Sequence, residues 1–119
     1  MFYISKRYEL LANRRRLQNN DNIVLQECRW VVTFYFRTMR LCHDGNVCES
    51  VGVQCKRALA KLSGKCMNDI LRVTNATPER VALWFAEQIP DCYKVQIRDS
   101  DNALAVFVRD NDSINGDEL

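Results

Sequence analysis

The residues in this sequence best suited to chemistry are six cysteines and a single histidine. Thiolate and imidazole are ligands that zinc prefers in proteins, and four such residues follow one another closely: Cys42, His43, Cys48 and Cys55. Their spacing argues against a zinc site, because no two cysteines form a C-x-x-C pair and Cys55 fits equally well on an apolar helix face. We therefore expect small buried cysteines, no metal and no other cofactor.

No catalytic motif accompanies these residues. The chain contains no Gly-rich phosphate loop, no G-x-S-x-G nucleophile and no H-E-x-x-H metal motif. Cys42 and Asp44 flank His43, but catalytic partners usually converge from distant parts of a chain and are rarely adjacent in sequence. The sequence therefore predicts a protein that is not an enzyme.

The basic residues give the pattern most indicative of a binding function. The net charge is only +2, yet residues 1–65 carry 12 lysines and arginines against five acidic residues, whereas residues 66–119 carry five against ten. Such asymmetry is typical of proteins that bind nucleic acid or an acidic surface, although folding can bring the two halves together and neutralise it.

Two groups of cations could contact phosphates. The first group is a run of three arginines, Arg14, Arg15 and Arg16. The second is a set at helical spacing, which consists of Arg57, Lys61, Lys65 and Arg72. Four cations along one helix edge could each reach a phosphate. The alternative is that the run ends a helix and that the set is an ordinary solvated face.

The element that should organise the fold is the long apolar segment from Asn22 to Cys42. As a strand it would carry polar residues on both faces, whereas at 100° per residue its polar side chains gather on one arc. Its length also suits a helix better than a strand. We expect a largely buried central helix, and the alternative is a strand over residues 28–41.

The flanking segments also show helical spacing. Residues 2–17 are expected to form a helix that docks Ile4, Tyr8 and Leu11 on the core. Residues 49–73 carry a long apolar stripe that predicts a helix, or two helices that meet at Ser63-Gly64.

The C-terminal half gives clearer local signals. Thr77 and Pro78 are typical of the first residues of a helix, and Pro90 ends it. Residues 93–108 then alternate in hydrophobicity around the turn Asp99–Asn102, which predicts a β-hairpin. Residues 110–119 are polar and acidic and are expected to form a flexible tail.

The expected cellular location follows from the charged residues that interrupt the apolar segments. Arg29, Arg37 and Arg40 lie within the central segment, which argues against a membrane span, and the first 16 residues do not resemble a signal peptide. We expect a cytoplasmic or nuclear protein with reduced cysteines.

The sequence therefore predicts one domain over residues 1–109, mainly α, with four to five helices and a C-terminal hairpin. The alternative fold is α+β. The expected function is a non-enzymatic regulatory protein that binds nucleic acid or another polyanion. The alternative is a protein-interaction or inhibitor module that acts on a larger protein partner. In either case we expect a homo-oligomer, such as a homodimer, because the central segment and residues 103–108 leave apolar surface to cover.

Overall fold

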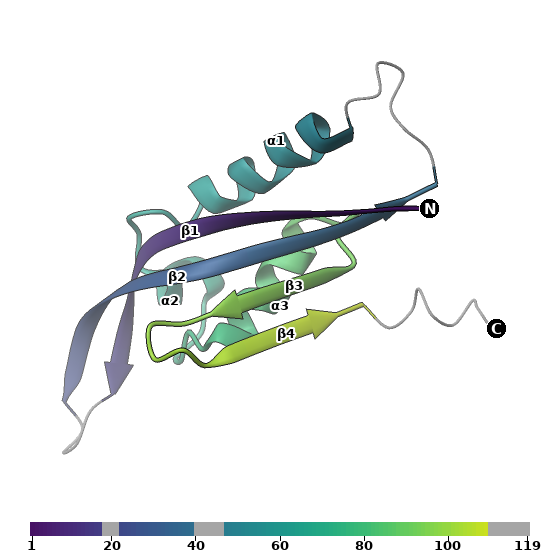
Figure 1. Cartoon of the computed structure of the whole chain (residues 1–119). Helices are drawn as coiled ribbons and strands as arrows, with labels where there is room; N and C mark the ends of the chain where they lie inside the picture. Colours follow the sequence, from purple (N-terminus) through teal and green to yellow (C-terminus); the bar gives the residue numbers. More distant parts are fainter. Residues whose placement is uncertain (18–21, 40–46, 110–119) are drawn as a thin grey trace.

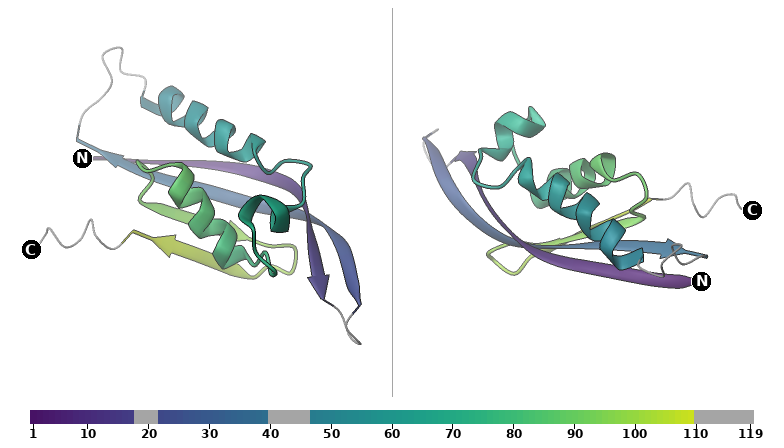
Figure 2. Two further views of the ribbon diagram at one scale, coloured as in Figure 1. Left: turned by 180° about the vertical axis from the view of Figure 1, so that it is seen from behind. Right: turned by 90° about the horizontal axis from the view of Figure 1, so that it is seen from above.

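The computed structural model describes residues 1–17, 22–39 and 47–109, with the backbone alone for residues 47–49. Four strands form one antiparallel sheet in the order β1-β2-β3-β4 (Figure 1). They are β1 (Phe2–Leu17), β2 (Ile23–Thr38), β3 (Lys94–Arg98) and β4 (Leu104–Val108). The helices, which lie together on one face of the sheet (Figure 2), are α1 (Val47–Ala60), α2 (Met67–Leu71) and α3 (Pro78–Gln88). The prediction of a mainly α fold is therefore wrong.

The central apolar segment is the strand β2 and not a helix. Its residues that face the helices between Cys28 and Phe36 are all apolar and buried, and Trp30 and Phe34 are the largest of them. Gln26 and Thr38, whose polarity argued against a strand, lie toward the two ends of this face. The alternative prediction, a strand over residues 28–41 that joins the hairpin in a sheet, is closer to the observed structure than the helix is, since β2 pairs with both β1 and β3.

Residues 2–17 also form a strand where a helix was expected. Leu10 and Ala12 of β1 are buried, Ile4 and Tyr8 pack against the core, and Leu11 is 48% exposed on the other face. The strand pairs with β2 along its whole length, from Phe2 opposite Thr38 to Leu17 opposite Ile23. Tyr8, Leu10 and Ala12 recur at every second residue, which is the spacing of a strand with one face on the core.

The expected long helix over residues 49–73 is divided. α1 ends at Ala60, and Gly64 has a positive φ of 73° in the turn that precedes α2. The N–H of Gly64 donates to the carbonyl oxygen of Leu11 at 2.8 Å, so this turn is bonded to the outer edge of β1. Of the two predictions for residues 49–73, the structure shows the second, which is two helices that meet near Ser63-Gly64.

The predictions for the C-terminal half were confirmed. Thr77 caps α3 by accepting the N–H of Arg80, and Pro78 is its first residue. β3 and β4 form the expected hairpin, with Ala105 buried and Phe107 packed against the core. Residues 110–119, the expected acidic tail, lie outside the described residues.

The two hairpins differ greatly in length, and this difference creates the surfaces discussed below. β3 pairs only with Val31–Tyr35 of β2, so the β1–β2 ribbon continues beyond the short hairpin and curves away from it (Figure 1). α2 lies beside this continuation of β1 (Figure 2). In the described part of the chain, no helix is both long and apolar enough to cross a membrane.

Candidate functional site

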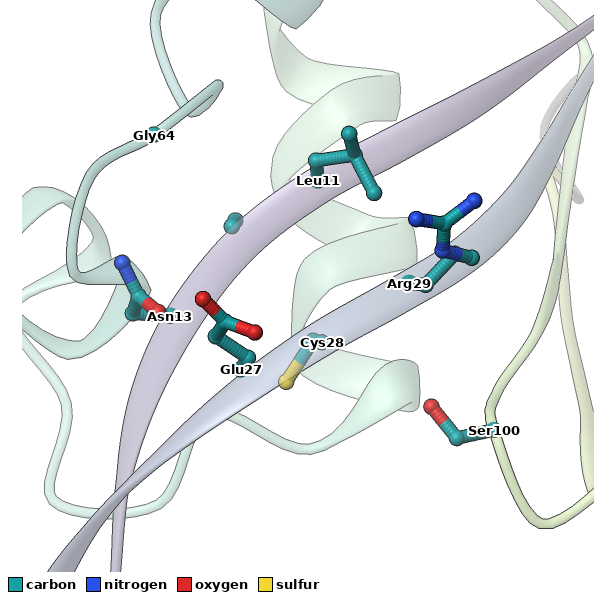
Figure 3. Close-up of a pocket in the computed structure, with 8 residues that line it drawn as sticks. Leu11, Asn13, Glu27, Cys28, Arg29, Gly64 and Ser100 are labelled. Atoms are coloured by element: carbon teal, nitrogen blue, oxygen red, sulfur yellow. The ribbon is translucent and has the colours of Figure 1, made fainter.

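A pocket of about 340 Å³ opens where the β1–β2 ribbon leaves the short hairpin (Figure 3). Its main wall is formed by three cross-strand pairs, which are Leu11 with Arg29, Ala12 with Cys28, and Asn13 with Glu27. Gly64 lies at one side, and Ser100 lies at the other with its hydroxyl directed toward β2. We call this set of eight residues the ribbon pocket.

Backbone hydrogen bonds hold both sides of the ribbon pocket. On the β1 side, the N–H of Gly64 donates to Leu11 and the N–H of Asn13 donates to the carbonyl of Lys65 at 2.9 Å. On the other side, the carboxylate of Asp99 accepts the N–H groups of Asp101 and Ala103, each at 2.9 Å, and so fixes the turn that carries Ser100. The pocket is therefore bounded by bonded backbone on both sides.

The polar groups of the ribbon pocket suit hydrogen bonding to a small molecule. Glu27 supplies a carboxylate that accepts, Asn13 an amide that donates and accepts, and Ser100 a hydroxyl that does both. The Arg29 guanidinium is only partly available to a ligand, because it lies 3.4 Å from the Glu9 carboxylate and forms an ion pair with it. A ligand here would meet neutral and acidic partners in the middle of the pocket and a cation at one end.

Three of the four cysteines whose side chains are described are poorly suited to nucleophilic chemistry. Burial raises the pKa of Cys28, and the nearby cations Arg14 and Arg16 offset this in part. Burial also raises the pKa of Cys55 to about 12 and raises that of Cys92. These three thiols stay protonated at neutral pH, whereas the thiolate is the reactive form.

The predicted cations do not lie on one helix edge. Arg57 lies on α1, Lys61 and Lys65 follow the end of that helix, and Arg72 follows α2. The ammonium group of Lys61 donates to the side-chain oxygen of Gln88 at 2.7 Å. Because α1 stops at Ala60, the expected basic stripe does not exist.

The arginine run occupies the far end of β1. Arg14 stacks over the Trp30 ring at 5.1 Å and donates to Gln26 and to the carbonyl of Ala76, so it supports the fold. Arg15 and Arg16 line a separate cleft together with Arg72. The structure therefore brings together three of the seven predicted residues.

Of the residues considered for zinc, Cys42 and His43 lie outside the described residues, as does the side chain of Cys48. Cys55 is fully buried in the core. Within the described ranges, no group of three or more histidine, cysteine or acidic side chains is placed to hold a metal ion.

Comparisons with known proteins identify the fold. No protein-family model matches the sequence, and no curated protein matches it either. Among solved structures, the chain is similar to 6-pyruvoyl tetrahydropterin synthase of Caenorhabditis elegans, with a TM-score of 0.66 over 90% of this chain and 94% of that one. The two sequences are 14% identical. The likeness shows that this chain has the tunnel fold of that enzyme.

This finding corrects the functional interpretation of the sequence. A β-rich fold shared with a pterin synthase contradicts a helical regulatory protein that binds nucleic acid or a polyanion. It equally contradicts the alternative of an inhibitor module. The prediction that the chain is not an enzyme stays a prediction, because a neighbour at this identity does not test it.

The residues of the ribbon pocket were missed by sequence analysis. Asn13, Glu27 and Ser100 come from three elements and form no motif along the chain. The one usable signal was strand alternation, which would have placed Asn13 and Glu27 on one face had residues 2–38 been read as a hairpin.

Proposed function

We propose that this protein is a non-catalytic binding protein for a small nitrogen-rich ring compound of the pterin class, which it takes in the ribbon pocket. The choice of ligand class is motivated by the structural likeness to 6-pyruvoyl tetrahydropterin synthase. That likeness covers 90% of this chain and 94% of the synthase.

The observation that carries the proposal is the pairing of Glu27 with Asn13 across the ribbon. A pterin presents an amino group and a ring N–H side by side, and one carboxylate can accept both. The Asn13 amide and the Ser100 hydroxyl then serve the ring's carbonyl and ring nitrogens. The pocket volume is at the lower end of the range for small-molecule sites.

The non-catalytic part of the proposal is based on the thiols. Cys28, the only thiol among the residues that line the ribbon pocket, has a pKa raised by burial. A protonated, buried thiol is an inert packing group rather than a nucleophile. The described residues therefore offer ligand-binding groups in this pocket without an activated nucleophile.

Pterin fluorescence gives a direct test. We expect saturable binding of a pterin or its tetrahydro form, and Glu27→Gln should weaken it at least tenfold, because a charge-assisted hydrogen bond contributes about 1.5–3 kcal/mol. Glu87→Gln, an exposed carboxylate on α3, is the matched control and should leave affinity unchanged. Failure of both pterins to bind would overturn the ligand class, and turnover of a pterin substrate would overturn the non-catalytic role.

We further propose that the chain forms a homo-oligomer through the free edge of β4. Leu104, Val106 and Val108 point away from the helices and are 49%, 46% and 49% exposed. The strand LAVFV contains no charged residue, and uncharged edge strands readily pair with other strands. Two copies of β4 paired antiparallel about Val106 bring Leu104 opposite Val108 in an isologous interface.

Light scattering over a dilution series tests this assembly. The wild-type mass should exceed that of one chain at high concentration, and Val106→Lys should return it to the monomer value. Leu83→Lys, which changes an apolar side chain on α3 that is 43% exposed, is the control and should leave the mass unchanged. A monomer at every concentration, or an unchanged mass in the Val106 variant, would contradict the proposal.

A further inference from the structure

A second cleft, of about 610 Å³, lies between the far end of β1 and the loop that follows α2. β1 contributes Arg15, Arg16 and Leu17, β2 contributes Ile23, and α2 with its following loop contributes Asn68, Asp69 and residues 72–75. We call this set the arginine cleft. It is distinct from the ribbon pocket, with which it shares no lining residue.

The charges in the arginine cleft are unbalanced. Arg15 forms an ion pair of 2.6 Å with Asp69, and this hydrogen bond lowers the pKa of that carboxyl. The guanidinium groups of Arg16 and Arg72 make no hydrogen bond or ion pair with any of the described residues. Three guanidinium groups against one carboxylate leave two positive charges for a ligand.

The floor of the cleft is rigid because one buried side chain holds both walls. Asn68 is 2% exposed. Its side-chain oxygen accepts the N–H of Arg15 at 2.7 Å, and its amide nitrogen donates to the carbonyl oxygens of Arg15 at 3.3 Å and Thr74 at 2.7 Å. The strand that carries Arg15 and Arg16 is thereby fixed to the loop that carries Arg72.

Arg72 itself has an unusual backbone. Its φ and ψ are 59° and 49°, in the left-handed region that residues with a β-carbon rarely adopt, and its N–H donates to the carbonyl of Asn68. Many helices end on a residue in this conformation, usually a glycine, and the bond to Asn68 is the usual bond that caps the helix. Here it holds an exposed, unpaired guanidinium at the rim of a cleft.

The remaining wall is apolar. Leu17 and Ile23 are a cross-strand pair and are 59% and 69% exposed. A depression on the other side of the arginine run is lined by Glu79, Asp99 and Asp101, and those carboxylates would repel an anion. An anion is therefore favoured on the side where Arg72 lies.

We propose that the arginine cleft binds a small organic anion, whose oxyanion is held by Arg16 and Arg72 and whose apolar body lies on Leu17 and Ile23. Guanidinium groups bind both phosphate and carboxylate in bidentate geometry, and the shared chemistry is an oxyanion acceptor. Two positive charges and an apolar wall within one cleft suit a molecule of this mixed character, such as an aryl phosphate or an aryl carboxylate.

Backbone-amide NMR titration with phenyl phosphate and with benzoate tests the proposal. We expect saturable shifts confined to residues 15–17, 23 and 68–75, and the tighter of the two probes identifies the oxyanion. Arg72→Gly, which keeps the left-handed backbone, and Arg16→Gln should each weaken binding at least fivefold. Arg57→Gln, on α1, should leave the affinity unchanged.

Three outcomes would overturn the proposal. One is the absence of saturable shifts with either probe. Another is a response spread over Arg57, Lys61 and Lys65, which would indicate general attraction of anions. The third is equal loss of affinity in the Arg57 and Arg72 variants.

Discussion

Arg72→Gly should make the protein more stable while it removes a cation from the arginine cleft. In the structure the residue has a left-handed backbone, its side chain is exposed, and its N–H donates to Asn68. Glycine keeps that N–H and adopts the left-handed region without a steric penalty. The substitution therefore removes strain without removing a bond that the described residues form.

The expected gain is the difference between two terms. The left-handed conformation costs a residue with a β-carbon about 1–2 kcal/mol. The greater freedom of glycine in the unfolded chain offsets about 0.5–1 kcal/mol of that gain. The free energy of unfolding should therefore rise by about 0.5–1 kcal/mol, which for a chain of 119 residues corresponds to about 2–4 °C in melting temperature.

Urea unfolding of the wild type and two variants checks this reasoning. Arg72→Gly should raise the midpoint without changing the slope of free energy against urea. Arg57→Gly removes the same side chain from the last turn of α1 and should lower the free energy of unfolding by about 0.5–1 kcal/mol. If Arg72→Gly destabilises as much as Arg57→Gly, the backbone of Arg72 is not strained and the argument for its special position fails.

Other perturbations test the core and the thiols. Asn68→Ala should cost about 2–4 kcal/mol in urea unfolding, because the N–H of Arg15 and the carbonyl of Thr74 lose their partner; a cost below about 1 kcal/mol would show that water replaces the amide. Phe34→Ala should lower the free energy of unfolding by about 3–5 kcal/mol, since the ring is fully buried and its centroid lies 5.2 Å from that of Phe85. A loss as small as that of a substitution at an exposed site would contradict the place of Phe34 in the core. The pKa of Cys55 is raised from 9.0 to about 12, so the folded state keeps a proton that the unfolded chain releases. Stability should be full below about pH 9 and decline as the pH rises toward 12, and Cys55→Ala should make that decline shallower over the same range. An unchanged decline would refute this assignment.

Residues with strong local preferences were predicted well. Thr77 and Pro78 fix the start of α3 through a hydrogen bond to the N–H of Arg80 and a preset φ, and both effects act within one turn of helix. The hairpin of β3 and β4 likewise depends on alternation and on the turn held by Asp99. Gly64 marked the interruption between α1 and α2 for the same local reason.

The two long strands were mispredicted because their pattern has meaning only in the sheet. Gln26 and Thr38 counted against a strand when every position was weighed equally, but they lie toward the ends of the face that the helices cover. Leu11 fitted a helical spacing with Ile4 and Tyr8, yet it is exposed because β1 alternates with period 2. Neither fact can be predicted from the sequence alone, because both depend on which part of each strand the helices cover.

The sequence by itself determined the local elements of the C-terminal half, the apolar character of the core and the uneven charge. These depend on residues within a few positions of one another. Tertiary structure alone decided that the apolar segment is a strand, that Asn13 and Glu27 share a pocket, and that Arg16 and Arg72 share a cleft. The physical reason is that strand pairing and cleft formation join residues tens of positions apart, and the free energy of those contacts depends on partners that no window of sequence contains.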